Sequence, residues 1–517
     1  MIATRRLQLI AATALAATAC SSPASAEPVI VVDGDRTQRV DDPFVPSRAE
    51  IDLGPAPSRP RLRAHTAGHG PRAVDRALRR AVQTGAISRS ESSSYRRIYR
   101  SSRATLRRLA GARRREMGYV VGSLDRIALA RRLTPTRMPA IFLQLRRNSA
   151  YWPSRTFPAK GDQVSFRGSE LLFEYFPGRG LQLHPLSNFK KANLLIGACG
   201  KSGKGQPVCG AKPPGPRAGT PCRPERLRRL LDELSDLAVQ RGRKFIAWEY
   251  LFDFGGGSPP WMSGMAQATA ITALARGARL LQQPDYNTTA EAALGAFEAA
   301  APLGVRTKGP LGGVHYLQYS FAPRLYIFNA FFQSLIGLHD YGKLTGSERA
   351  TGLFRKGELE ARREVARSDV GDWSRYSFRG AESTQEYHEL LREILQGLGR
   401  RLGLDGIYCD YATRYRGYQT EPPVVRFRGP RGAVKGRPAR VRFSVSKLSV
   451  VELKIYRGAR LAFRRIGTFR RGSASFPWRP GPAGRFTVQL GAKELRTGRS
   501  LRGRTSGAIV VRRAPGD

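Results

Sequence analysis

The chain has 517 residues, with 88 lysines and arginines against 40 aspartates and glutamates and a formal net charge of +48. This length allows two or three domains with sizeable hydrophobic cores. The positive charge favours polyanionic partners such as acidic polysaccharide. No helix-turn-helix, zinc-finger or RNA-binding motif is found, which argues against a nucleic-acid partner.

The N-terminus has the pattern of a signal peptide. A short basic region precedes the apolar stretch 7–19, which is too short to span a bilayer, and Ala24-Ser25-Ala26 is a small-x-small cleavage site. We therefore predict that residues 1–26 are a signal peptide, that the protein is secreted or part of the cell envelope, and that it has no transmembrane segment. Cys20 offers the alternative of a lipoprotein anchor.

The next two regions differ in composition. Residues 27–72 are rich in Pro, Asp, Arg and Ser and poor in apolar residues, which predicts a disordered linker. Residues 73–133 carry apolar residues such as Val120 and Leu124 near helical spacing, with arginines on the other face. This pattern predicts a helical N-terminal region.

Residues 134–420 alternate helical patterns with short strand-like pieces, which favours an (α/α) toroid with inserted β-hairpins. Helix ends and loops would then line a central cleft. The expected helices are 140–146, 224–241, 263–281, 289–300, 324–344, 347–366 and 384–402. The expected strands lie within 163–175, 245–254 and 313–321.

Residues 421–517 show period-two alternation separated by Gly, Pro and Arg turns, which predicts a β-sandwich similar to immunoglobulin-like or fibronectin-like modules. Its expected strands are 441–445, 450–456, 474–478, 484–490 and 508–511. The chain as a whole is therefore expected to be multidomain and mainly α. A homodimer is one assembly that the sequence allows.

Four cysteines remain after the signal peptide: Cys199, Cys209, Cys222 and Cys409. In an oxidising compartment they predict two disulfides, for which three connectivities are open. A zinc site is disfavoured because the spacings are long and no histidine lies nearby. No metal is predicted.

The segments of 134–420 that hold candidate site residues contain many tyrosines beside arginines and few carboxylates. A glycoside hydrolase needs two carboxylates, and no obvious pair stands out among Glu174, Asp372, Glu382 and Glu386. Tyrosine serves as a base when cations lower its pKa, and arginine binds a substrate carboxylate bidentately. The composition therefore suits removal of a proton alpha to a carboxylate. Serine-hydrolase, P-loop and dinucleotide-binding motifs are absent.

Four ordered blocks resemble the D-glucuronyl C5-epimerase family, in its helical C-terminal domain. They are Pro260-Trp261-Met262-Ser263-Gly264-Met265-Ala266-Gln267-Ala268, the helix from Phe328-Asn329 to His339-Asp340, the pair Tyr376 and Arg379, and Tyr387-His388. The resemblance covers about residues 171–402.

The resemblance implies that the C5 proton of a uronic acid in a polysaccharide is removed and returned, converting D-glucuronate to L-iduronate without a cofactor. It points to Tyr319, Tyr376 and Tyr387 as the acid/base set, with His184 as a substitute base where the family has tyrosine. The substrate-binding set is Arg379, Arg324, Arg179, Lys190, Gln318, Trp261, Gln267, Asn329 and His388. For Trp261 and Gln267, a purely architectural role at the start of the helix is the alternative.

One departure from the family concerns Gln318, where the animal enzymes have a glutamate before the tyrosine. An amide cannot act as a base, so either the tyrosines suffice or activity is impaired. Three alternatives stay open on the same fold: a polyuronate lyase, a glycoside hydrolase, and a non-catalytic polyanion-binding envelope protein.

Overall fold

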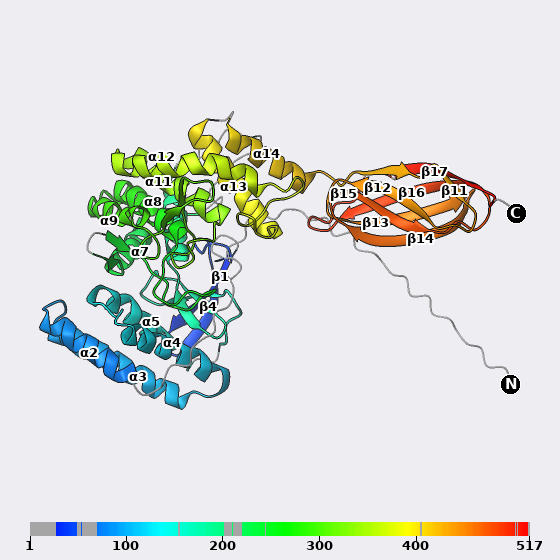
Figure 1. Ribbon diagram of the computed structural model, residues 1–517. Helices are drawn as coiled ribbons and strands as arrows, with labels where there is room; N and C mark the ends of the chain where they lie inside the picture. Colours follow the sequence, from blue (N-terminus) through cyan, green and yellow to red (C-terminus); the bar gives the residue numbers. More distant parts are fainter. Residues whose placement is uncertain are drawn as a thin grey trace, which may run out of the picture.

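The computed structural model describes residues 27–48, 53, 70–153, 156–200, 209, 220–242, 245–403, 406–501, 503 and 505–514. The predicted signal peptide and Cys20 lie outside these residues. The described chain contains both helices and strands, so the architecture is mixed rather than mainly helical. Figure 1 shows a large helical unit beside a smaller unit of strands formed by the C-terminal residues.

The helices are α2 (Gly70–Gln83), α3 (Arg89–Arg108), α4 (Gly111–Leu129), α5 (Met138–Tyr151), α6 (Pro185–Cys199), α7 (Pro224–Asp236), α8 (Gly264–Leu281), α9 (Asp285–Ala293), α10 (Gly295–Glu298), α11 (Phe328–Thr345), α12 (Glu348–Glu364), α13 (Gln385–Leu402) and α14 (Ile407–Thr420). Two short 3-10 helices are η1 (Pro135–Arg137) and η2 (Val365–Ser368). The strands of the helical unit are β1 (Glu27–Asp33), β2 (Arg36–Asp42), β3 (Gln163–Phe166), β4 (Phe173–Phe176), β5 (Gly180–Leu183), β6 (Val239–Arg241), β7 (Phe245–Ala247), β8 (Arg306–Lys308) and β9 (Val314–Tyr316). In the described chain, no helix combines the length and the apolar character needed to cross a membrane.

Capping side chains confirm two of the predicted helix starts. The Ser263 hydroxyl accepts the Ala266 N–H at 3.2 Å at the start of α8, and Thr384 caps α13. Several other helix predictions were wrong at their ends. The helix expected over 289–300 begins at Asp285 as α9 and breaks at Leu294 before the short α10, and the one expected over 140–146 extends over Met138–Tyr151. The helix expected from residue 324 begins at Phe328, because Ile327 is extended and bridges to Ser377.

The helix expected over 224–241 ends at Asp236, and the chain then forms the hairpin β6–β7. The sequence pattern missed this change because the strands have only three residues each.

The prediction of a disordered linker was wrong for residues 27–42, which form β1 and β2. The run Val29-Ile30-Val31-Val32 is β-branched and suits a strand, but it was averaged with the polar residues that follow. These strands join a five-stranded sheet in the order β2-β1-β3-β4-β5, in which β1 runs parallel to β3. Ile30 is fully buried there.

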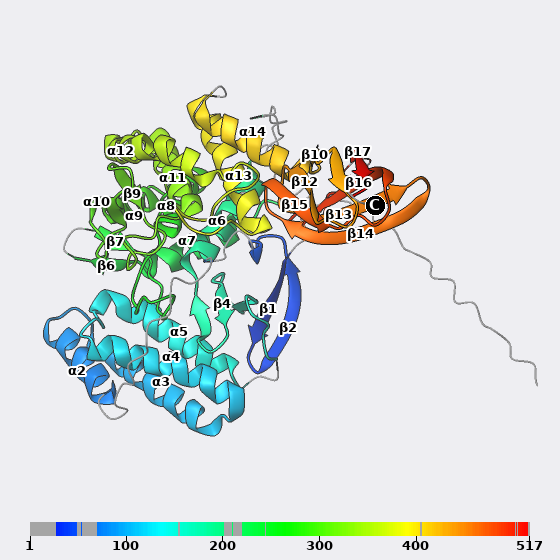
Figure 2. The same ribbon diagram turned by 45° about the vertical axis from the view of Figure 1, so that its right-hand side comes forward.

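One large hydrophobic cluster runs through the helical unit, beside a small separate cluster of Val29, Val45 and Leu172. Buried residues from β1 and α2 through α14 belong to one continuous cluster, so the packing has no break at residue 133. Figure 2 shows α2 to α5 on one side of the β1–β5 sheet and the later helices above it. Within this core α8 and α11 lie very close, because Gly337 of α11 faces the Ala268 backbone of α8.

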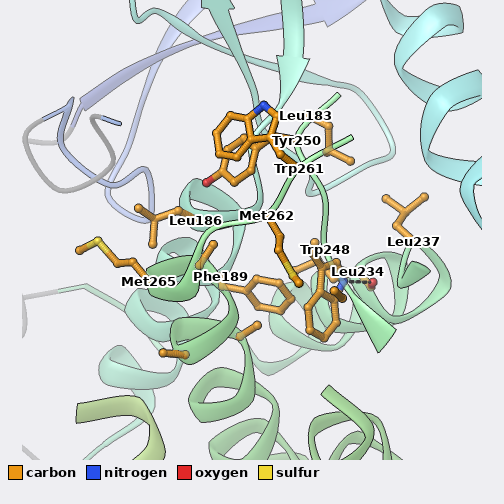
Figure 3. Packing of buried hydrophobic residues seen from close by; sticks show 14 of the residues in the cluster. Leu183, Leu186, Phe189, Leu234, Leu237, Trp248, Tyr250, Trp261, Met262 and Met265 are labelled. Carbon is orange, nitrogen blue, oxygen red and sulfur yellow. Dashed lines mark hydrogen bonds between the residues drawn. The ribbon is translucent and has the colours of Figure 1, made fainter. Parts of the chain in front are cut away.

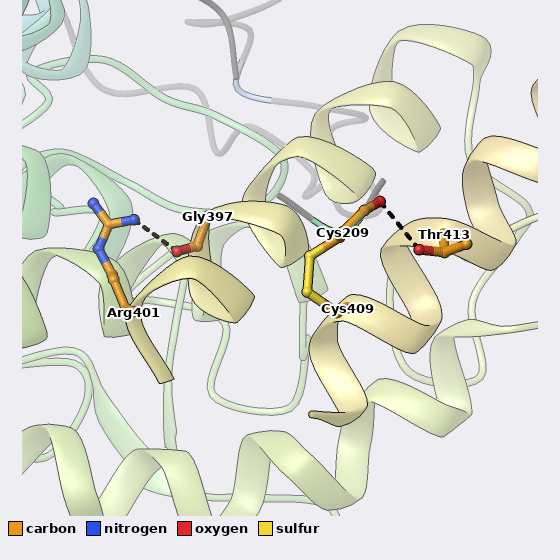
Figure 4. The surroundings of a disulfide bond; sticks show 5 residues. All are labelled: Cys209, Gly397, Arg401, Cys409 and Thr413. Atoms are coloured by element: carbon orange, nitrogen blue, oxygen red, sulfur yellow. Dashed lines mark hydrogen bonds between the residues drawn. A yellow bond between two sulfur atoms is a disulfide. The ribbon is translucent and has the colours of Figure 1, made fainter. Parts of the chain in front are cut away.

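The two predicted disulfides are present, and the structure selects one of the three connectivities. Cys199 pairs with Cys222, and Cys209 pairs with Cys409. The second bond joins Cys209, which lies between α6 and α7 in the chain, to Cys409 of α14. The Thr413 hydroxyl of α14 also donates to the Cys209 carbonyl at 3.1 Å (Figure 4). All four cysteines are therefore used in covalent cross-links.

The C-terminal residues form two sheets around a core of their own, which we call the two-sheet unit (residues 425–512). Its strands are β10 (Val425–Gly429), β11 (Gly432–Val434), β12 (Ala439–Val445), β13 (Ser449–Arg457), β14 (Arg460–Phe469), β15 (Gly472–Trp478), β16 (Gly484–Glu494) and β17 (Thr505–Arg512). The sheet orders are β10-β12-β15 and β11-β17-β16-β13-β14. All five predicted strands are confirmed, while β10, β11 and β14 were missed. The edge strand β14 was missed because it is mostly exposed and arginine-rich. The immunoglobulin-like assignment stays a prediction.

We expect Gly337→Ala to lower the free energy of unfolding by about 2 kcal/mol, because the added Cβ would lie 2.5 Å from the Ala268 carbonyl oxygen. Urea denaturation measures the change. Gly352→Ala is the matched control, since no atom lies within 4 Å of its added Cβ on α12. The control should stabilise by about 0.5–1 kcal/mol through helix propensity. Equal effects at the two positions would contradict a tight α8–α11 contact.

Candidate functional site

The start of α8 is built on a stack of two aromatic rings. Trp261 is 1% exposed, and its ring lies parallel to that of Tyr250 with centroids 4.2 Å apart (Figure 3). The Trp261 indole N–H donates to the Phe252 carbonyl at 2.8 Å, and its backbone pairs with that of Tyr250. Ring stacking and the indole hydrogen bond thus fix the Trp261 side chain in place, which indicates a structural role.

The two buried amides near this helix start also have structural partners. The Gln267 side chain donates to the Trp248 carbonyl at 2.8 Å and accepts the Trp248 N–H at 3.1 Å. The side-chain amide oxygen of Gln318 accepts a hydrogen bond from the Ser263 hydroxyl at 2.9 Å. Both amides therefore join loop segments to α8, and the architectural alternative describes Gln267 well.

Tyr319 lies directly behind the Trp261 stack. Its ring is fully buried, 5.7 Å from the Trp261 ring and 5.4 Å from Phe321, and its hydroxyl donates to the Leu53 carbonyl. Backbone bonds from Gly264 N–H to the Leu317 carbonyl and from Ser320 N–H to the Met262 carbonyl, both 2.9 Å, hold the chain on each side of it. The helix start therefore fixes the position of Tyr319.

The structure places Tyr376 and Tyr387, two of the three predicted catalytic tyrosines, in contact. Their ring centroids are 4.9 Å apart in an edge-to-face arrangement, and each residue is 9% exposed. Tyr376 comes from the loop before α13 and Tyr387 from its first turn. Asn329 of α11 donates its side-chain amide to the Tyr387 carbonyl at 3.3 Å, which ties α11 to this pair.

His388 holds the same region together. Its ring stacks on Trp373 at 3.7 Å, and its two nitrogens lie 2.8 Å from the Ser374 hydroxyl and 3.1 Å from the Tyr415 carbonyl. Burial lowers the pKa of His388 to about 4, so the ring is neutral at pH 7. This geometry explains His388 by its contacts with Trp373, Ser374 and Tyr415 rather than as a contact for an anion.

His184 is fully buried at the start of α6. Its Nδ1 accepts the Ser187 N–H at 3.0 Å as a helix cap, and its Nε2 lies 3.5 Å from a Glu174 oxygen. Burial lowers the pKa of His184 to about 3. One ring nitrogen of His184 already caps α6, and the ring is not readily protonated. These contacts indicate a structural role for His184 rather than proton transfer.

The predicted cations are less buried than the tyrosines. Arg379 and Arg324 are exposed, and Arg179 and Lys190 are half-buried. Arg379 adopts a left-handed backbone conformation at φ 58° three residues after Tyr376, and its guanidinium lies 5.6 Å from the Phe378 ring. Of these four, Arg379 belongs to the loop that carries Tyr376.

A cationic cleft beside Trp261 was missed by the sequence analysis. Its volume is about 550 Å³, and its lining includes Trp261, Phe321 and three arginines: Arg132, Arg137 and Arg241. Arg137 and Arg241 both bind buried Glu249, at 2.6 and 2.5 Å. The three guanidinium groups exceed this one carboxylate in charge, so the cleft remains positive. The missed hairpin β6–β7 was the signal that would have found it, because β6 ends at Arg241 and Glu249 follows β7 two residues after its end.

A second unexpected feature is a fully buried pair of His315 and Glu364, with Nδ1 and Oε1 2.9 Å apart. Burial and the neighbouring Glu360 carboxylate raise the pKa of Glu364 to about 9, and burial lowers the pKa of His315 to about 3. Both groups are therefore neutral at pH 7.

Residues 241–417 match the family model of the D-glucuronyl C5-epimerase C-terminus. The family that the sequence blocks resemble is confirmed for this part of the chain. The matched segment contains Tyr319, Tyr376, Arg379 and Tyr387, and it also contains the α8 start. It spans less than half of the chain. No curated protein matches.

Solved structures with some similarity include the unsaturated glucuronyl hydrolase from Bacillus sp. GL1, at 11% identity over 67% of this chain and 82% of that chain, with a TM-score of 0.28. The CARDB domain of a Pyrococcus furiosus protein is similar at 15% identity over 17% of this chain and 91% of that chain, with a TM-score of 0.14.

We expect Glu364→Gln to stabilise the protein increasingly as the pH rises from 5 to 8. A carboxyl whose folded pKa is raised contributes stability below its unfolded pKa of about 4.5, and this contribution is lost as the pH rises toward the folded value. The amide has no proton to lose, so the gain over the native protein at pH 8 should be on the order of 2 kcal/mol. Urea denaturation at several pH values measures it.

Glu389→Gln is the control for this substitution, because Glu389 is exposed on α13. Its difference from the native protein should not change with pH. A pH-independent effect of Glu364→Gln would show that Glu364 is ionised in the folded protein.

Proposed function

We propose that the protein inverts C5 of glucuronate residues in an acidic polysaccharide, converting D-glucuronate to L-iduronate. The observation that carries the proposal is the pairing of Tyr376 and Tyr387 inside the segment that matches the epimerase family. A base removes the C5 proton, the electron pair delocalises into the carboxylate as an enolate-like intermediate, and a proton returns to the opposite face. The reaction has no net redox change and needs no cofactor.

The roles in this proposal follow from position. Tyr376 and Tyr387, whose rings lie edge to face, are the proposed proton-transfer groups. Tyr319 is fully buried and its hydroxyl donates to the Leu53 carbonyl, so we assign it a supporting role. Arg379 on the loop of Tyr376 is suited to bind the uronate carboxylate. The buried Gln318 amide bonds to Ser263 and supplies no base, so proton transfer rests with the tyrosines.

The carboxylates favour an epimerase over a hydrolase. Asp372 and Glu382 are both bound by Arg496, at 3.1 and 2.5 Å, and Glu174 faces His184. Glu386 is exposed at the start of α13. A hydrolase needs one carboxyl as an acid and another as a base or nucleophile, and Asp372 and Glu382 are both already engaged by Arg496.

The finer predictions belong to this proposal as well. We take the helical unit to be an (α/α) toroid, the two-sheet unit to be immunoglobulin-like, and the protein to be secreted or attached to the cell envelope. A glucuronate polymer is the proposed partner, and the cationic cleft beside Trp261 is its proposed path along the protein. Polyuronate lyase activity and non-catalytic binding of a polyanion are the competing functions.

We expect the native protein to introduce deuterium at C5 when it is incubated with a heparosan-type glucuronate polymer in deuterated water, as read by NMR. Tyr376→Phe and Tyr387→Phe should each lower the rate by roughly 10²- to 10⁴-fold, because each removes a proton-transfer group. Tyr326→Phe, at a half-buried tyrosine outside the pair, is the matched control and should keep the rate.

Other outcomes identify the alternatives. Ultraviolet absorbance from an unsaturated product would indicate a lyase, and new reducing ends would indicate a hydrolase. Binding without deuterium incorporation across several glucuronate polymers would indicate a polyanion-binding protein.

We expect Arg132→Glu to weaken binding of the same polymer by roughly tenfold or less at low ionic strength, with the difference shrinking as salt is added. Arg132 is exposed and lines the cleft, so the change reverses charge at the proposed path. Arg485→Glu makes the same charge change on an exposed position of β16. Equal weakening by both variants would show that net charge alone governs binding, and it would remove the cleft from the proposal.

A further inference from the structure

The proposed catalytic tyrosine Tyr376 lies on a loop that the two-sheet unit touches. This loop, residues 369–383, joins η2 to α13, and we call it the tyrosine loop. Backbone bonds from Arg375 N–H to the Ser368 carbonyl at 2.7 Å and from Tyr376 N–H to the Ala381 carbonyl at 3.0 Å give it shape. Further backbone bonds run from Ser383 N–H to the Ser374 carbonyl at 2.8 Å and from Phe378 N–H to the Tyr326 carbonyl at 2.9 Å. Side-chain contacts with the two-sheet unit add to this backbone frame.

Arg496 of the two-sheet unit binds the tyrosine loop at both ends. It follows β16, and its side chain is 12% exposed. One guanidinium nitrogen lies 3.1 Å from the Asp372 carboxylate, and another lies 2.5 Å from the Glu382 carboxylate. These two carboxylates flank Tyr376 in sequence, so a single arginine joins the two ends of the loop.

The same guanidinium also packs on the ring at the centre of the contact. It lies 5.1 Å from the Trp373 ring, which is fully buried and stacks on His388 at 3.7 Å. The Trp373 indole N–H donates to the Ser383 carbonyl at 2.9 Å. Because His388 follows Tyr387, this stack links Arg496 to the segments of both paired tyrosines.

Further contacts come from other turns of the two-sheet unit. The Leu448 N–H donates to the Asp372 carboxylate at 3.1 Å, and Arg470 lies 3.1 Å from Glu382. Lys447 donates to the Tyr418 and Glu421 carbonyls at 2.7 and 2.6 Å, at the end of α14. Figures 1 and 2 both show the two-sheet unit beside α14.

We propose that the two-sheet unit holds the tyrosine loop in its ordered conformation, with Arg496 as the positioning residue that clamps Asp372 and Glu382. The unit then serves the site directly, which neither a spacer nor an appended binding module would do. Removing Arg496 leaves the Asp372 carboxylate, which is 5% exposed, without this guanidinium. A poorly solvated carboxylate that loses its cation is unfavourable, so the loop rearranges to expose it.

The test is hydrogen–deuterium exchange of the full chain, followed by mass spectrometry of peptides that cover the tyrosine loop. We expect Arg496→Ala to speed exchange in residues 369–383 by about tenfold or more, while peptides from β13 and β16 keep their native rates. Arg496→Lys should have an intermediate effect, since an ammonium keeps the charge but loses the fork that spans two carboxylates. Arg464→Ala, which removes an ion pair with Glu452 within the two-sheet unit, is the matched control and should leave the loop unchanged.

Two outcomes would overturn the proposal. The first is native exchange in the tyrosine loop of Arg496→Ala. The second is faster exchange spread equally over β13, β16 and the loop, which would show a general stabilising role. If Arg496→Ala does not fold, Asp372→Asn tests the same contact by removing one partner, and it should also loosen the loop.

The catalytic consequence rests on the proposed function. In Arg496→Ala the rate constant for deuterium incorporation at C5 should fall by at least about tenfold. Polymer binding should fall by less, because the cationic cleft beside Trp261 lies outside the tyrosine loop. If the native protein incorporates no deuterium, the proposed function fails while the exchange result still decides the clamp. A loosened loop with a native rate constant would overturn the role of Arg496 in positioning Tyr376.

Discussion

The close approach of α8 and α11 is the constraint on which the rest of the helical unit depends. A Cβ on Gly337 would lie 2.5 Å from the Ala268 carbonyl oxygen, and one on Gly264 would lie 2.7 Å from the Leu317 carbonyl oxygen. Close-packed interiors leave no room for such atoms, so only glycine allows this contact. The two helix starts then set the backbone next to Tyr319 and place Asn329 against Tyr387. The positions of the site residues therefore depend on the close backbone packing at these glycines.

Arginine has two separate uses in this protein. Some guanidinium groups neutralise buried acids, as Arg226 does for Glu170, whose pKa is held near 2 by this arginine and by Lys191. The charge of such an arginine is neutralised inside the protein and does not attract a polyanionic partner. Others, including Arg132 in the cleft, face solvent beside an aromatic wall. The net charge of +48 therefore overstates the field available to a polyanion, and the location of each arginine matters more than their number.

Patterns encoded locally predicted the helix starts that frame the site, where Ser263 and Thr384 act as caps. The family blocks singled out Tyr376 and Tyr387 as candidates, and the tertiary structure shows that their rings are in contact. Prediction did less well where a role depends on a distant partner. His184 was predicted as a substitute base and His388 as a substrate contact, yet both rings are buried and engaged by a helix-cap or carbonyl contact. Arg496 lies far from the tyrosines in sequence, so no local pattern connects it to their loop.

Periodicity, caps and family blocks were enough to establish the main helices, the two-sheet unit and the epimerase-like segment, because each is a short-range pattern of side chains. The tertiary structure alone decided which cysteines pair, that residues 27–42 complete a sheet, and that Arg496 reaches the tyrosine loop. These features are contacts between segments far apart in the chain. The free energy of these contacts depends on how the segments pack and on how deeply their charges are buried, and a local sequence pattern determines neither.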